Sequence, residues 1–223
     1  MESGYPNLKF SVDKDFDQWT CKEFLTYDPN DIFSNAILTD HEKLNMLKEV
    51  PRSKREGDFN RYIDQYYKDN LKELKKARES SEKEWKKVEI RFFNLINSLF
   101  DTKNTDGSKC VYMWPEGNYI CAISIFNCNP RFIEDKDFQA YYRHPDGIVY
   151  ICVHEMLHFA FYDYVKNNHN ELFKNLGKDG MWKLSETFND VILRSPDFVK
   201  ITKVENPSIY AQSSEELKKY SGV

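Results

Sequence analysis

Residues 146 to 167 are the stretch that most constrains how this chain can fold. Apolar side chains recur there at helical spacing, yet they cover nearly every side of the helix instead of one stripe. The apolar positions are Ile148, Val149, Ile151, Cys152, Val153, Met156, Leu157, Phe159 and Phe161. A helix that is apolar all round belongs in a protein core. We therefore predict a buried helix that begins after Asp146 as its N-cap and runs to about Asn167.

Three polar residues lie inside this apolar helix: His154, Glu155 and His158. The two histidines are four residues apart, so both point from the same side of the helix, one turn apart. Two imidazoles placed in this way can occupy two corners of a tetrahedral zinc site. Glu155 lies roughly 100° around the helix from His154, where it can reach a zinc-bound water as general base without binding the metal itself. Burying three such groups together without a metal would be costly, so the pattern favours zinc over a structural role.

A catalytic zinc site needs a third protein ligand and an open position for water. The sequence leaves four candidates open, namely Glu186, Asp190, His169 and Asp163. Glu186 lies on a second predicted helix, Met181 to about Arg194, and Asp190 follows it by one turn on the same face. An acid one turn beyond the ligand can accept the free ring N–H of a ligating histidine and so fix its orientation.

The HExxH helix, a glycine-containing loop at Gly177 to Gly180 and the segment Glu186 to Asp190 together resemble the gluzincin group of metallopeptidases. The small core is similar to that of the minigluzincins. The resemblance implies a peptidase with the zinc ligands His154, His158 and Glu186, the general base Glu155, and Asp190 as the residue that orients a ligand. It also implies that a strand at Tyr119 to Phe126 is an edge strand that binds an extended peptide substrate.

The rest of the sequence predicts further helices and a hairpin. Helical spacing of apolar residues continues from residue 59 to residue 99, and we favour a break near Ser81, which begins a possible capping box, over one long helix. Residues 31 to 50 are predicted to be helical, with an interruption near Asp40. Residues 110–114 and 119–126 are predicted to be two strands of a hairpin.

These elements predict an α+β protein. Its core would combine a small mixed β-sheet, a backing helix, the HExxH active-site helix and the downstream glutamate helix. We predict three regions: a helical N-terminal accessory region at 1–80, a catalytic core at 81–203 and a polar C-terminal tail at 204–223.

Composition narrows the environment and the partners of the chain. Its net charge of −4 implies no general attraction to nucleic acid or anionic membranes. No apolar run approaches the ~18 residues of a membrane span. The five cysteines show no zinc-knuckle or redox spacing, and the first residues do not resemble a signal peptide. We therefore expect a reduced, cytoplasmic protein. A peptide or protein substrate is what the resemblance to the gluzincins implies.

Two other functions remain open at this point. The chain could be a latent or non-catalytic zinc-binding regulator, with the N-terminal region or the tail at 204–223 lying in the cleft. Alternatively, residues 1–80 could be a partner-binding module with the zinc core as its scaffold. The residue that would stabilise the oxyanion also stays open. Its candidates are Arg194, Tyr210, Tyr162 and Tyr164.

Overall fold

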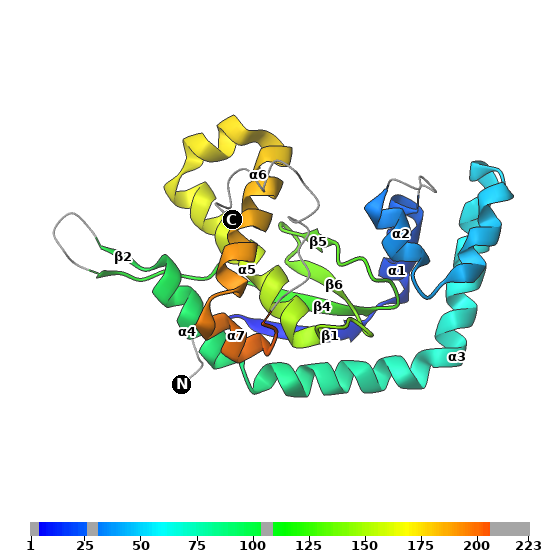
Figure 1. The fold of residues 1–223 in the computed structure, drawn as a ribbon, viewed down its shortest axis with the longest axis horizontal. Helices are drawn as coiled ribbons and strands as arrows, with labels where there is room; N and C mark the ends of the chain where they lie inside the picture. Colours follow the sequence, from blue (N-terminus) through cyan, green and yellow to red (C-terminus); the bar gives the residue numbers. More distant parts are fainter. Residues whose placement is uncertain (1–4, 26–30, 104–108, 206–223) are drawn as a thin grey trace. The chain divides into compact units, whose positions relative to one another are not determined.

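The computed structural model describes residues 5–25, 31–103 and 109–205 of this mixed α+β protein (Figure 1). The chain divides into two compact units, each assembled from separate segments. The sheet unit comprises Asn7–Glu84 and Asn118–Ile148. The helical unit comprises Met1–Pro6, Trp85–Gly117 and Val149–Val223. This division differs from the predicted boundaries after residues 80 and 203.

The sheet unit is built on one small mixed sheet of four strands, in agreement with the predicted small mixed sheet. Its strands are β1 (Asn7–Val12), β4 (Asn118–Ser124), β5 (Arg131–Phe132) and β6 (Asp137–Tyr141), in the order β1-β4-β6-β5. β4 runs parallel to β1 and to β6, and β5 is antiparallel to β6. In β1, exposed and buried residues alternate at first, with Leu8 and Phe10 turned to the core.

Two predictions about strands are wrong. Residues 119–126 do not form an edge strand, because β4 is hydrogen-bonded on both sides, by β1 and β6. The hairpin with residues 110–114 does not form either. β3 (Lys109–Cys110) pairs instead with β2 (Thr102–Lys103) in a separate two-stranded sheet. The region 1–80 is also not purely helical, since β1 belongs to the main sheet.

Four helical elements complete the sheet unit: α1 (Lys14–Phe24), α2 (Ile32–Leu38), the 3₁₀ helix η1 (Glu42–Glu49) and most of α3 (Arg52–Lys86). The predicted interruption at Asp40 is confirmed, because Asp40 has a φ of 63° between α2 and η1. The break predicted near Ser81 occurs later, between Lys86 and α4 (Glu89–Phe100). Ser81 caps nothing; its hydroxyl donates to the carbonyl of Ala77 inside α3.

A fully buried carboxylate, that of Asp17 on α1, joins the helices to the sheet. One of its oxygens accepts hydrogen bonds from Ser124 Oγ at 2.6 Å and from Gln139 Nε2 at 2.9 Å. The other accepts from Tyr67 OH at 2.5 Å and from the backbone N–H of Ile125 at 3.2 Å. Both oxygens of the carboxylate therefore have partners, as burial of such a group requires.

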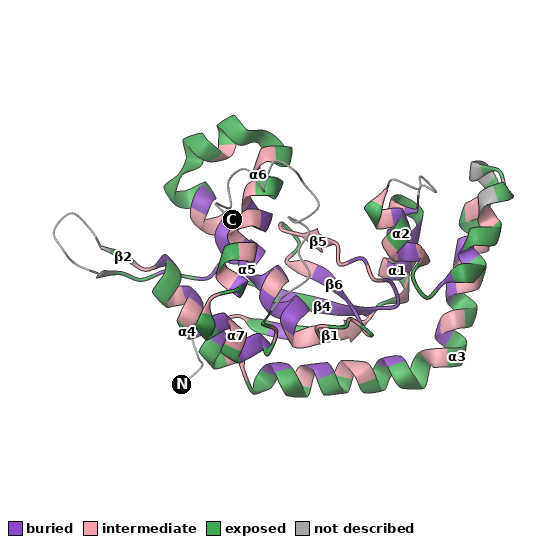
Figure 2. Cartoon of the chain, viewed as in Figure 1, coloured by how far each residue is buried: buried purple, intermediate pink, exposed green. Residues whose placement is uncertain are grey.

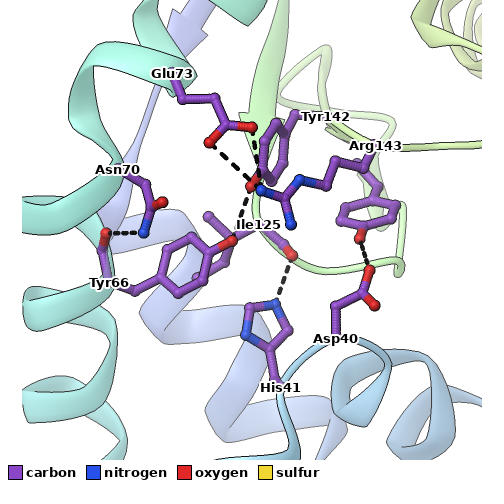
Figure 3. A network of polar contacts seen from close by, with 9 residues as sticks. Asp40, His41, Tyr66, Asn70, Glu73, Ile125, Tyr142 and Arg143 are labelled. Atoms are coloured by element: carbon purple, nitrogen blue, oxygen red, sulfur yellow. Dashed lines mark hydrogen bonds and ion pairs between the residues drawn. The ribbon is translucent and has the colours of Figure 1, made fainter.

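A second polar network lies where α3 meets the chain after β4 and β6 (Figure 3). His41 is buried, and its Nε2 lies 2.7 Å from the carbonyl oxygen of Ile125. Because a carbonyl can only accept, Nε2 carries the proton and Nδ1 accepts from Tyr62 OH, also at 2.7 Å. Close by, Tyr66 OH lies 2.8 Å from Tyr142 OH. His41 is thus held in one neutral tautomer.

We expect His41 to make the protein less stable in mild acid. Burial lowers the pKa of His41, although the hydrogen bond to Ile125 opposes this effect. An unfolded chain binds a proton at the ordinary histidine pKa near 6.5. The unfolded state therefore holds more protons below that pH, and the free energy of unfolding falls by up to roughly 1.4 kcal/mol per pH unit. Urea unfolding between pH 7.5 and pH 5 measures this slope.

The matched comparison for this prediction uses two histidine variants. His41→Gln should flatten the slope between pH 6.5 and pH 5. His169→Gln, at an exposed histidine, should leave it unchanged. An unaltered slope in His41→Gln would assign the acid sensitivity to other groups.

The helical unit contains α4, the two-stranded sheet, α5 (Ile148–Asn168), α6 (Asn170–Leu193) and α7 (Pro196–Thr202). The predicted buried helix is confirmed: most of α5 is buried along its length (Figure 2). It starts slightly later than predicted. Gly147 takes a φ of 81° directly before it, so Asp146 is not its N-cap.

The predicted loop at Gly177–Gly180 is largely helical. Only Gly177 leaves the helical conformation, with φ 62° and ψ −173°, and α6 continues on both sides of this kink. The second part of α6 contains the predicted helix from Met181. Its aromatic side chain Phe188 packs on Phe161 of α5 and Phe100 of α4, with ring centroids 4.8 Å and 5.7 Å away. This contact places α6 against α5.

Two further expectations concern the chain as a whole. The predicted tail at 204–223 lies outside the described residues except for its first two. Among the described residues, no helix combines the length and the apolar character needed to cross a membrane.

Candidate metal centre

α5 and α6 bring four polar side chains together in the helical unit. From α5 come His154, Glu155 and His158, whose potential ligand atoms all lie within 4.8 Å of one another. From α6 comes Glu186, which is buried like Met181 and Ser185 before it. All four residues lie on helices, which hold side chains more rigidly than loops do.

Both imidazoles and the Glu186 carboxylate converge on one point. His154 Nε2 and His158 Nε2 are 3.1 Å apart. Glu186 Oε2 lies 3.4 Å from His154 Nε2, and Glu186 Oε1 lies 3.4 Å from His158 Nε2. Each of the three residues therefore turns a possible metal-ligating atom, a nitrogen or an oxygen, toward the other two.

These separations fit a zinc ion. Zinc binds nitrogen and oxygen ligands at about 2.1 Å, and tetrahedral ligands at that radius are roughly 3.4 Å from one another. The distance of 3.1 Å between the two Nε2 atoms, and that of 3.4 Å from each of them to one of the two Glu186 oxygens, are close to this value. Two neutral imidazoles and one carboxylate are also a ligand set that zinc accepts when a fourth position stays open. The residues present thus fit the metal that the sequence predicts.

Glu155 occupies a different place from Glu186. Its Oε1 lies 3.9 Å from His154 Nε2, farther than either oxygen distance of Glu186. The cluster His154, Glu155 and His158 could hold a metal by itself, but Glu186 lies closer to the imidazoles. Of the two carboxylates, Glu186 is thus the one nearer to His154 Nε2, and Glu155 lies beside it.

The two histidines differ in how far they are buried. The side chain of His158 is fully buried, whereas that of His154 is 15% exposed. The group therefore opens to solvent on the side of His154. Burial alone would raise the pKa of Glu186, but hydrogen bonds and charge attraction from His154 and His158 outweigh it and lower that pKa well below its usual range.

Two of the other three candidates for third ligand, His169 and Asp163, have different partners. His169 lies exposed at the start of α6, and its ring faces Tyr164 at 5.7 Å. Asp163 accepts a hydrogen bond from Asn167, one turn along α5.

Asp190, which was predicted to orient a ligand, has a partner on its own helix. Asp190 Oδ1 accepts a hydrogen bond from Arg194 Nε at 2.9 Å, so this side chain is paired within α6. Its neighbour Asn189 is the residue that contacts α5. Asn189 is fully buried, and its Nδ2 donates to the carbonyl oxygen of His154 at 2.8 Å. The sequence analysis missed Asn189, which lies one turn after Glu186 just as Asp190 does.

The described candidates for stabilising an oxyanion have partners of their own, which for Tyr162 is the ring of Phe161. Arg194 pairs with Asp190. Tyr164 packs on Phe100, with ring centroids 4.8 Å apart. Tyr210 lies outside the described residues. The contacts of these residues therefore do not select an oxyanion-stabilising group.

Comparison with protein-family models, with curated proteins and with solved structures finds no match for this chain.

Proposed function

We propose that this protein is a zinc-dependent peptidase whose centre is formed by His154, His158, Glu186 and Glu155. The observation that carries the proposal is the convergence of four atoms in a largely buried group. The two imidazole Nε2 atoms are 3.1 Å apart, and each lies 3.4 Å from a different oxygen of Glu186. The resemblance of the HExxH helix and the downstream glutamate helix to gluzincins supports peptide bonds as the substrate class.

Each residue has a separate task in this proposal. His154 and His158 offer Nε2 and Glu186 offers a carboxylate oxygen, so the three together hold the metal. Zinc, when bound, supplies a Lewis acid that polarises the scissile carbonyl and makes a water acidic at neutral pH. Glu155 accepts a proton from the attacking water on its carboxylate and passes it to the leaving amine nitrogen. The carbonyl carbon gains a C–O bond and loses its C–N bond.

A purely structural explanation would treat the group as a buried ion-pair cluster. In that case Glu186 would bind imidazoles that carry extra protons, and no metal would be needed. The facing Nε2 atoms of the two histidines argue against it, because two protonated imidazoles 3.1 Å apart repel each other. If only one imidazole is protonated, it forms a buried ion pair with Glu186 between α5 and α6. Such a pair is a weak source of stability.

Metal removal tests the proposal directly. We expect the full chain to bind one zinc per molecule, to cleave a mixed peptide library, and to lose both properties after dialysis against a chelator. Added zinc should restore both. Elemental analysis and mass spectrometry of the peptides provide the measurements.

Two other results would redirect the proposal. A chain that binds no zinc would identify the group as an ion-pair cluster. A chain that binds zinc but leaves every peptide intact would favour the non-catalytic alternative.

A further inference from the structure

α6 contacts His154 at two different points. Glu186 Oε2 lies 3.4 Å from the ring of His154. Asn189 Nδ2 donates to the backbone carbonyl of the same residue at 2.8 Å. Glu186 and Asn189 are three residues apart, so they lie on the same face of α6, one turn from each other. The ring and the backbone of His154 are therefore both held by one helix.

The contact to the carbonyl oxygen of His154 requires a hydrogen-bond donor. The carbonyl oxygen of His154 can only accept hydrogen bonds, so the group that faces it must be a donor. This fixes the orientation of the Asn189 amide, with Nδ2 toward His154 and Oδ1 away from it. An aspartate at the same position would have the same size but would turn an anionic acceptor toward an acceptor.

The second amide atom argues against a role in packing alone. Asn189 Oδ1 is buried and has no hydrogen-bond partner among the residues that the structure describes. Such an acceptor reduces stability, and an apolar side chain of similar size would fill the same space without that cost. The presence of asparagine at this fully buried position is therefore better explained by its contact to His154 than by packing.

We propose that Asn189 is a positioning residue of the metal centre, which fixes the backbone of His154 against α6 and so sets the spacing of His154 and Glu186. The inference rests on the proposed zinc site, and it gives to Asn189 the orienting role that the sequence suggested for Asp190. Asn189 acts through His154 and touches neither metal nor substrate.

The experiment compares Asn189→Asp and Asn189→Ala with the matched control Asp190→Asn. Asn189→Asp and Asp190→Asn exchange the same two groups at adjacent positions, one buried and one paired with Arg194. Zinc affinity is measured by competition with a chromophoric chelator. Loss of a residue that orients a ligand lowers metal affinity roughly 10–100-fold, and we expect a loss in this range for both Asn189 variants. Asp190→Asn should keep the affinity of the wild type.

Two further measurements separate positioning from a general effect on folding. The absorption spectrum of the Co²⁺-loaded protein reports ligand geometry and should change in the Asn189 variants only. The thermal unfolding midpoint, with and without zinc, gives the stabilisation that the metal adds. We expect this zinc-dependent increment to shrink in the Asn189 variants. If Asn189→Ala does not fold, Asn189→Asp and Asn189→Ser provide the same comparison.

The outcomes distinguish this inference from the proposed function. Wild-type protein that binds no zinc would overturn the metal site itself. Wild-type zinc binding together with unchanged affinity, spectrum and increment in the Asn189 variants would overturn only the role of Asn189. A drop in metal-free stability with an unchanged zinc-dependent increment would likewise reduce Asn189 to a structural contact.

Discussion

A Glu155→Gln variant is expected to bind zinc like the wild type and to lose most of its peptidase turnover. The substitution keeps the size of the side chain and removes the carboxylate that would take the proton from the attacking water. General acid–base catalysis contributes roughly 10²–10⁴-fold to enzymatic rates, so kcat/KM should fall by a factor in this range. Zinc content should not change, because His154, His158 and Glu186 all remain. A fluorogenic peptide assay and elemental analysis of the same preparation measure both quantities.

The control for this variant is Glu171→Gln, at an exposed position near the start of α6 that pairs with Lys174 across 3.3 Å. It should retain both zinc and turnover. If Glu155→Gln loses zinc together with turnover, Glu155 is a ligand, which its distance of 3.9 Å from His154 Nε2 makes a real alternative. Turnover at the wild-type rate would remove Glu155 from the reaction.

The neighbourhood of His154 and His158 could be predicted from sequence because helical geometry alone orients residues four apart. Glu186 was harder to place, because no sequence pattern near it indicates how α6 packs on α5. That packing depends on long-range contacts such as Phe188 with Phe161. The choice between Asn189 and Asp190 could not be made at all from spacing, because both lie about one turn after Glu186. The rotation of α6 about its own axis determines which of the two side chains faces α5.

Errors in the predicted fold have a similar cause. The alternation of Leu8 and Phe10 with polar neighbours is visible in the sequence, but the pairing of β1 with β4 joins segments more than a hundred residues apart. Parallel pairing of this kind leaves no turn motif between the strands. The sequence therefore favours a local partner for residues 119–126. The edge position implied by the resemblance to gluzincins is wrong as well, because β4 lies between β1 and β6.

A Glu186→Ala variant is expected to lose most of its zinc affinity, and its turnover with it. Structural zinc sites bind with about 10–16 kcal/mol, so one ligand of a small set contributes roughly 3 kcal/mol, which corresponds to more than a hundredfold in affinity. Both histidines would stay on α5, but neither carboxylate oxygen at 3.4 Å would remain to complete the three ligands. Competition with a chromophoric chelator measures the loss.

Glu186→Gln refines this result, because it keeps the volume of the side chain and removes only its charge. An amide oxygen is a weaker zinc ligand than a carboxylate, so we expect an affinity between that of Glu186→Ala and that of the wild type. The metal-free forms of both variants should stay folded by circular dichroism, since Phe188 still holds α6 on α5. Undiminished zinc binding in Glu186→Ala would eliminate Glu186 as third ligand and leave the cluster of His154, Glu155 and His158 as the metal site.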